Sequence, residues 1–184
     1  MSKQLERETA VAEWQELVKT GNSLYNEKRY AQAEMQYAAA LRIAEKFAAS
    51  ESLAEETPED QHDLKVRLEK SLNNMAALYH TQGKYSMAED LLQRCLELKR
   101  DIHGDRNLEV AINLHNLAAL CSARRRYEQA EPLYQESISI REELLGENHA
   151  ELVPVLQNYA LLLRKTHRED EAAEIEERIT RIES

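Results

Sequence analysis

The sequence repeats itself at an interval of 42 residues. In each copy a leucine is followed four positions later by an alanine, and positions four apart lie on the same face of an α-helix. The three pairs are Leu72 and Ala76, Leu114 and Ala118, and Leu156 and Ala160. The small residue lets a neighbouring helix approach closely. A fixed period of this kind predicts an all-α chain of stacked helix pairs.

Each copy also contains a short turn and a second helix. The turns are expected at 81–84, 122–126 and 165–168. An aromatic residue opens the second helix in two copies, and an alanine follows at a matched position in all three. These residues are Tyr85 and Tyr127, then Ala88, Ala130 and Ala172. We expect Gly104 and Gly146 to end their helices, because glycine adopts the left-handed conformation at little steric cost.

Composition agrees with a helical protein and excludes several functional classes. Aromatic residues make up 5% of the chain and glycines number four, whereas helix-forming residues dominate. A net charge of −10 argues against general nucleic-acid binding. No apolar run is long enough for a membrane span, and the charged first ten residues are not a signal peptide. Cys95 and Cys121 are predicted to be buried thiols, which places the protein in the cytoplasm.

The copies predict a single helical-repeat domain over residues 1–184. An earlier unit precedes the three copies, but Tyr30 lies 13 residues too far from Tyr85 for the same period. The surplus contains six acidic residues and no lysine or arginine, and predicts an exposed acidic loop or, alternatively, a surface for a basic partner. Pro58 should stop a helix there, and Thr57 or Asp60 should cap the next. The predicted segments are repeat 1 at 14–48, the acidic insertion at 50–63, repeat 2 at 66–102, repeat 3 at 108–146, and repeat 4 at 150–182.

The fourth unit departs from the pattern. Glu169 stands at its aromatic position and Glu176 at a later core position. A terminal repeat has no neighbour to cover it, so these residues predict a capping helix pair. An imperfect cap also leaves pairing with a second copy, a homodimer, as an alternative.

Together these features resemble the tetratricopeptide repeat. The 42-residue period, the glycine loops and the run Ala-Glu-Pro-Leu-Tyr134 are similar to the repeats of kinesin light chains. The usual His-Pro after the loop is replaced by Asn107-Leu108 and by His149-Ala150. The resemblance implies a right-handed superhelical solenoid of about four antiparallel helix pairs, as in short bacterial kinesin-light-chain-like proteins. It also implies a non-enzymatic protein–protein interaction adaptor. A tubulin-like filament is the specific partner it suggests, since a subset of such bacterial proteins accompanies tubulins.

In this family the first helices of the pairs line a concave groove that binds partners. The residues of this sequence at the family's groove positions are polar and mildly basic. This set is Asn22, Lys70, Asn74, His80, His115, Asn116, Asn158, Arg164 and Lys165. Its three matched asparagines at 74, 116 and 158 either grip a peptide backbone or hydrogen-bond within the stack. The alternative function is therefore a general peptide-binding or chaperone-type adaptor that holds short acidic segments.

Two further interpretations depend on individual residues. Val18, Ile112 and Asn116 stand where repeats that grip chaperone tails carry cations, so that function is disfavoured. The turn Arg124, Arg125 and Arg126 is either solvated or contacts an acidic filament surface.

The sequence contains no phosphate loop and no nucleophile elbow. Its histidines lack metal-ligand spacing. We therefore expect no enzyme activity, no cofactor and no metal.

Overall fold

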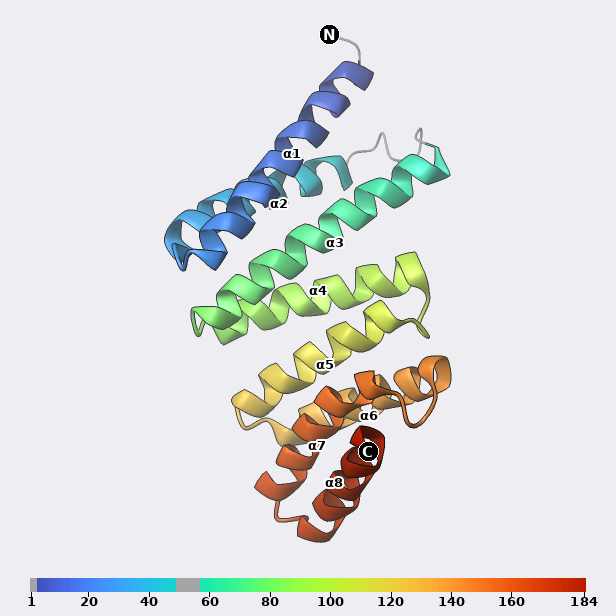
Figure 1. Ribbon diagram of the computed structural model, residues 1–184. Coiled ribbons are helices and arrows are strands. Elements are labelled where there is room, and N and C mark those ends of the chain that lie inside the picture. Colours follow the sequence, from blue (N-terminus) through green and yellow to red (C-terminus); the bar gives the residue numbers. More distant parts are fainter. Residues whose placement is uncertain (1–2, 49–56) are drawn as a thin grey trace. The chain divides into compact units, whose positions relative to one another are not determined.

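The computed structural model describes residues 3–48 and 57–184. Within these residues the chain forms eight α-helices and one short 3₁₀ helix, which confirms the predicted all-α class (Figure 1). The chain divides into two compact units, Met1–Leu98 and Lys99–Ser184, and each is described by itself.

Unit 1 contains the first three helices and most of the fourth. Their bounds are α1 Lys3–Asn26, α2 Tyr30–Ala48, α3 Pro58–Thr81 and α4 Tyr85–His103. One apolar cluster forms where α2 meets α3, from Leu24, Ala33, Tyr37, Met75 and Leu78. A second cluster holds the other end of the helices around Trp14, whose indole donates a 2.8 Å hydrogen bond to Ser71 Oγ. Burying both the ring and its polar nitrogen fixes α1 against α3.

The glycine in α1 is required by close packing. A Cβ on Gly21 would lie 2.5 Å from Cε1 of Tyr37 on α2. Tyr37 is 4% exposed, and its hydroxyl donates a 2.7 Å hydrogen bond to Asn22 Oδ1. The ring therefore packs closely against α1 at a position that carries no side chain.

The described residues cover only the C-terminal part of the predicted acidic loop. Residues 50–56 of the predicted segment lie outside the described residues, whereas 58–63 form the first turns of α3. The prediction of a loop was therefore wrong for 58–63. The expected cap is confirmed, because Thr57 Oγ1 accepts from the Asp60 backbone N–H at 3.2 Å. Proline is tolerated in the first helical turn, where its missing N–H has no partner to lose.

The first repeat is also longer than predicted, because α1 begins at Lys3 rather than near residue 14. Its exposed first turns carry Arg7, which forms a 3.0 Å ion pair with Asp60 of α3. This ion pair extends the contact between the two helices beyond their apolar face.

Unit 2 contains the remaining helix pairs. These are α5 Leu108–Ala123, α6 Tyr127–Leu145, the 3₁₀ helix η2 Ala150–Leu152, α7 Val153–Lys165 and α8 Glu169–Glu183. Each pair runs antiparallel across a tight turn (Figure 1). The core gathers aliphatic side chains of α7 around Ala118, Ala130 and Ala172, which are 3% exposed or less. The matched alanines therefore occupy the close contacts between helices that the period predicted.

The turns lie at 82–84, 124–126 and 166–168, so the predicted turns began too early and wrongly included Thr81, Ser122, Ala123 and Lys165. The second helices begin at Tyr85, Tyr127 and Glu169. Gly104 and Gly146 follow α4 and α6 with positive φ of 80° and 95°. The ψ of Gly146 is 153°, so this residue has an extended conformation with positive φ and not the left-handed helical one that was expected. Two positions before each second helix the backbone is left-handed, at Gly83 in one turn but at Lys28, Arg125 and His167 in the others.

Candidate functional site

A hollow of about 230 Å³ opens in unit 2 between α5, α6 and α7. We call it the α5–α7 hollow. It is lined by Ala119, Ser122, Ala123, Tyr127, Tyr134, Asn158, Leu161, Leu162 and Lys165. Most of these side chains are apolar, with one amide and one ammonium among them. Such a combination suits an apolar group that is oriented by a few polar contacts.

The hollow exists because α5 contributes small side chains to it. Ala119, Ser122 and Ala123 occupy the last turn and a half of α5, opposite the longer side chains of α7. On α7, Leu161 is 54% exposed although it is a large apolar residue. Lys165, the last residue of α7, is also exposed. An exposed leucine beside an exposed cation gives the hollow an apolar wall and a positive rim.

His115 and Asn158 join α5 to α7 beside the hollow. Asn158 Nδ2 donates to His115 Nε2 at 2.7 Å. The imidazole lies 6.0 Å from the ring of Tyr134, centroid to centroid. Burial, with a smaller contribution from the charge of Arg141, lowers the pKa of His115 from 6.5 to about 4. The ring is therefore neutral near pH 7 and accepts the amide hydrogen.

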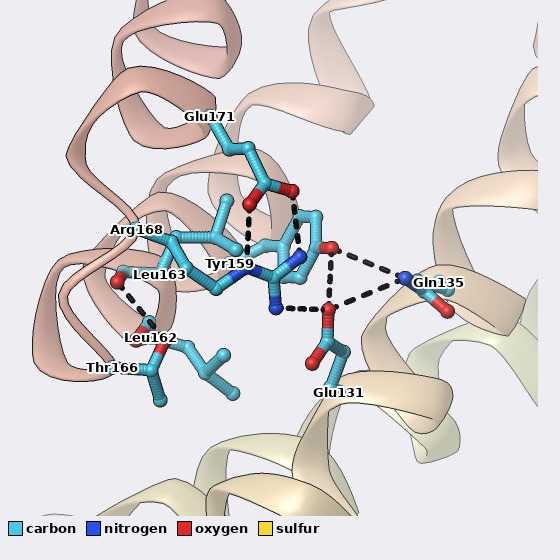
Figure 2. Close-up of polar contacts among 8 residues, drawn as sticks. All are labelled: Glu131, Gln135, Tyr159, Leu162, Leu163, Thr166, Arg168 and Glu171. Carbon is cyan, nitrogen blue, oxygen red and sulfur yellow. Dashed lines mark hydrogen bonds and ion pairs between the residues drawn. The ribbon is translucent and has the colours of Figure 1, made fainter.

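Tyr127 and Tyr134 form the aromatic floor of the hollow. Tyr134 packs near Tyr159, which belongs to a polar network (Figure 2). The rings of Tyr134 and Tyr159 lie 6.1 Å apart. The Tyr159 hydroxyl donates to Glu131 at 3.0 Å and accepts from Gln135 at 3.1 Å. These two bonds tie α7 to α6. Burial raises the pKa of Tyr159, so its hydroxyl stays protonated.

Arg168 extends this network to α8 (Figure 2). Its guanidinium donates to Glu131 at 2.7 Å and twice to Glu171, at 2.6 Å each. The bond to Glu171, followed by that to Glu131, raises the pKa of Arg168. One cation therefore bridges the carboxylates of two helices, in the paired geometry that suits a guanidinium.

In unit 1, the structure places the predicted groove residues in different environments. Asn22 is exposed and accepts from Tyr37. Lys70 and His80 are exposed, and the His80 ring lies 5.7 Å from that of Tyr85. Asn74 is half-buried. These four therefore stay predictions as binding residues.

In unit 2, the predicted residues separate into two groups. Asn158 and Lys165 line the hollow, and His115 contacts Asn158. Asn116 is exposed on α5. Arg164, in contrast, donates to Glu176 through two nitrogens, at 2.9 and 2.8 Å, and pairs with Glu169 at 2.8 Å. Two glutamates of the terminal repeat thus pair with Arg164 and connect it to α8, and its role in binding stays a prediction.

The arginine cluster forms the α5–α6 turn, as predicted. Arg124 ends α5 and Arg126 precedes α6, where its Nη2 lies 3.6 Å from Cys121 Sγ. Arg125 is exposed, with a φ of 58°.

Prediction from the sequence missed most of the hollow. Ser122 and Ala123 were assigned to the turn, and Leu161 was not selected. The sequence signal that would have found the hollow is a comparison of matched positions on the first helices, where α5 carries smaller residues than α1.

Two kinds of feature are absent from the described part of the chain. Among residues 3–48 and 57–184 no three His, Cys, Asp or Glu side chains gather in a way that could hold a metal ion. None of the helices described is both long enough and apolar enough to cross a bilayer. Cys95 and Cys121 are buried thiols that form no disulfide, as predicted.

Stacked antiparallel helix pairs with an open hollow between first helices define a helical-repeat protein-interaction scaffold. The tetratricopeptide repeat family model matches residues 67–143 and 109–182, so the chain belongs to this family. No curated protein matches the sequence. Proteins with this repeat are generally non-catalytic adaptors, and the fold supports a protein partner.

Several solved structures share the fold. BtubC (BKLC) from P. vanneervenii is 21% identical with a TM-score of 0.61, and the match covers 95% of this chain and 72% of that one. A putative kinesin light chain from Podosopora anserina, with nearly identical tetratricopeptide-like repeats, is 16% identical with a TM-score of 0.72, covering 92% and 74%. The apo form of RapI is 14% identical with a TM-score of 0.75, covering 93% and 56%. At these identities the likeness concerns the fold.

Proposed function

We propose that this protein is a non-enzymatic adaptor of the kinesin-light-chain type that holds a short acidic segment of a partner protein on the first helices of unit 2. The observation that carries the proposal is the α5–α7 hollow, with Leu161 as its apolar wall and Lys165 on its rim. Lys165 is a cation on a protein whose net charge is −10. A partner segment with carboxylates finds its favourable contact at Lys165 and repulsion over much of the remaining surface.

Peptide binding tests the proposal. Two fluorescent ten-residue peptides share the same apolar residues and carry either four glutamates or four lysines. Fluorescence anisotropy should show saturable binding of the acidic peptide alone. Lys165→Glu should weaken it at least tenfold, whereas Arg181→Glu, an equal charge change on exposed α8, should not. Equal affinity for both peptides, or equal effects of the two variants, would contradict the proposal.

A tubulin-like filament is the second candidate partner. The resemblance of the repeats to kinesin light chains supports it, together with the exposed cation of Arg125 in the α5–α6 turn. Co-sedimentation with a polymerised tubulin-like protein at low salt should pellet the protein, and Arg124→Glu combined with Arg125→Glu should release it. If wild type stays in the supernatant at low salt, the filament is not the partner.

The proposal includes a cytoplasmic location and leaves a homodimer to be tested. In a reducing compartment the buried thiols of Cys95 and Cys121 need no disulfide partner. Light scattering over about a hundredfold range of protein concentration separates a monomer from a dimer, because a dimer dissociates on dilution.

A further inference from the structure

The first three helices of unit 1 and the α5, α6 and α7 helices of unit 2 can be aligned residue by residue. Tyr30 corresponds to Tyr127, because each begins the second helix of its pair. Thr81 corresponds to Lys165, because each ends the following first helix. The residues of unit 1 that match the lining of the α5–α7 hollow are therefore Asn22, Tyr25, Asn26, Tyr30, Tyr37, Asn74, Ala77, Leu78 and Thr81.

The alignment separates what the two places share from what differs. The two floor tyrosines, the asparagine and one leucine are the same in both. On the first helix of each set, Asn22, Tyr25 and Asn26 of α1 are replaced by the smaller Ala119, Ser122 and Ala123 of α5. On the opposite wall, Ala77 and Thr81 of α3 are replaced by the larger Leu161 and Lys165 of α7.

In unit 1 the side chain of Tyr25 occupies the place that the hollow occupies in unit 2. Its ring packs on the cluster that includes Leu24 and Met75 and lies 5.6 Å edge-on from that of Tyr30. Its hydroxyl reaches α3, where it lies 2.7 Å from Thr81 Oγ1. A tyrosine at this position therefore fits between the first helices, with its ring on a tyrosine floor and its hydroxyl at the end of the second wall.

We infer that the α5–α7 hollow accepts an aromatic side chain, a tyrosine, from the partner protein. The inference rests on the proposed function and names the anchor of the bound segment. Ser122 is the specificity-determining residue, because it replaces the tyrosine that fills the matched place in unit 1. The incoming ring packs edge-on against Tyr127 as Tyr25 does against Tyr30, and its hydroxyl lies toward Lys165. The ammonium there donates a hydrogen bond to the phenol oxygen, or pairs with a neighbouring carboxylate.

Nuclear magnetic resonance with ¹³C-methyl alanine tests this directly. The probe is N-acetyl-tyrosinamide, and N-acetyl-leucinamide is the matched apolar control. Titration of wild type with the tyrosine probe should shift the methyl signals of Ala119 and Ala123 saturably, with an affinity at least threefold higher than for the leucine probe. The methyl of Ala172, which lies on α8 and is fully buried in the core of unit 2, should not move.

Substitutions should close the α5–α7 hollow in unit 2 and open a matching hollow in unit 1. Ser122→Tyr should abolish the shifts at Ala119 and Ala123, whereas Ser122→Ala should keep them. Tyr25→Ser should create a new probe-dependent shift at Ala77 in unit 1. Circular dichroism and the unmoved Ala172 signal confirm that each variant is folded.

Each outcome decides the inference. It is overturned if the tyrosine probe gives no saturable shift, if the leucine probe binds as well, or if Ser122→Tyr binds like wild type. Binding of the acidic ten-residue peptide is measured separately. If the peptide binds and the tyrosine probe does not, the tyrosine anchor is overturned and the proposed function stands. If the tyrosine probe binds and the peptide does not, the proposed function is overturned and the tyrosine site stands.

Discussion

Nδ2 of Asn158 and Nε2 of His115 lie 2.7 Å apart, so two residues that the sequence assigned to a partner-binding groove bind each other. The contact joins α5 to α7 next to the hollow. It requires the neutral imidazole, because a protonated Nε2 has no lone pair to accept the amide hydrogen. The interface between these first helices therefore depends on pH.

Acidification should destabilise unit 2 through protonation of His115. The pKa of His115 is about 4 in the folded protein and near 6.5 in the unfolded chain, so the unfolded state binds more protons between these values. Stability is complete above pH 6.5 and falls as the pH is lowered toward 4. The ring is only half-buried, so we expect a loss of about 1 kcal/mol between pH 7 and pH 5 once solvent screening is allowed for.

Urea unfolding at pH 7, 6 and 5 measures this effect. His115→Gln should remove most of the pH dependence, because glutamine does not titrate and still hydrogen-bonds with Asn158. His80→Gln, at an exposed position, is the control and should leave the dependence unchanged. A His115→Gln profile parallel to that of wild type would show that this contact is not the cause.

Replacing Gly21 by alanine should destabilise the protein. The new Cβ would meet the buried ring of Tyr37 at 2.5 Å. Overpacking of this kind costs about 1–3 kcal/mol, and the higher helix propensity of alanine offsets about 1 kcal/mol of that. A net loss of about 1–2 kcal/mol in urea unfolding is expected. Gln15→Ala, at an exposed site of the same helix, should be neutral or slightly stabilising, and Gly21→Ala combined with Tyr37→Leu should recover part of the loss.

Removing the Arg168 bridge should loosen α8. Arg168→Met keeps the length of the side chain but breaks the contacts with both Glu131 and Glu171. The thermal unfolding temperature should fall, and amide hydrogen exchange in α8 should quicken. Arg181→Met, in the exposed last turn of α8, removes a cation without touching this network and should change neither. Unchanged exchange in Arg168→Met would mean that apolar packing alone holds the helix.

The free energy of unfolding should depend on the ion pair between Lys99 of α4 and Glu109 of α5. Its side chain is 3% exposed and its Nζ lies 2.6 Å from Glu109 Oε2, a bond that lowers the pKa of Glu109. Glu109→Gln should cost about 1–2 kcal/mol, less than for a fully buried pair because the carboxylate is half exposed. Chemical unfolding at pH 7 measures the loss. Glu177→Gln, an exposed carboxylate on α8, should fall within experimental error of wild type.

The sequence by itself determined the helices, the turns between them and the family. These features repeat with a fixed local spacing, so Leu114 and Ala118 predict a helix face without reference to the rest of the chain. The left-handed glycine at position 104 and the cap at Thr57 are equally local, because each is decided by the conformation of a few neighbouring residues.

Only the tertiary structure decided which partners the predicted groove residues find within the protein. Arg164 pairs with Glu169 and Glu176, and Asn158 with His115, through contacts between residues of different helices that no spacing rule specifies. The α5–α7 hollow exists where unit 2 carries the small Ser122 and unit 1 carries the larger Tyr25. The two positions match only when the helices of the two units are aligned. Periodicity fixes which residues face a neighbouring helix, whereas open space and paired charges depend on what each neighbour brings to the contact.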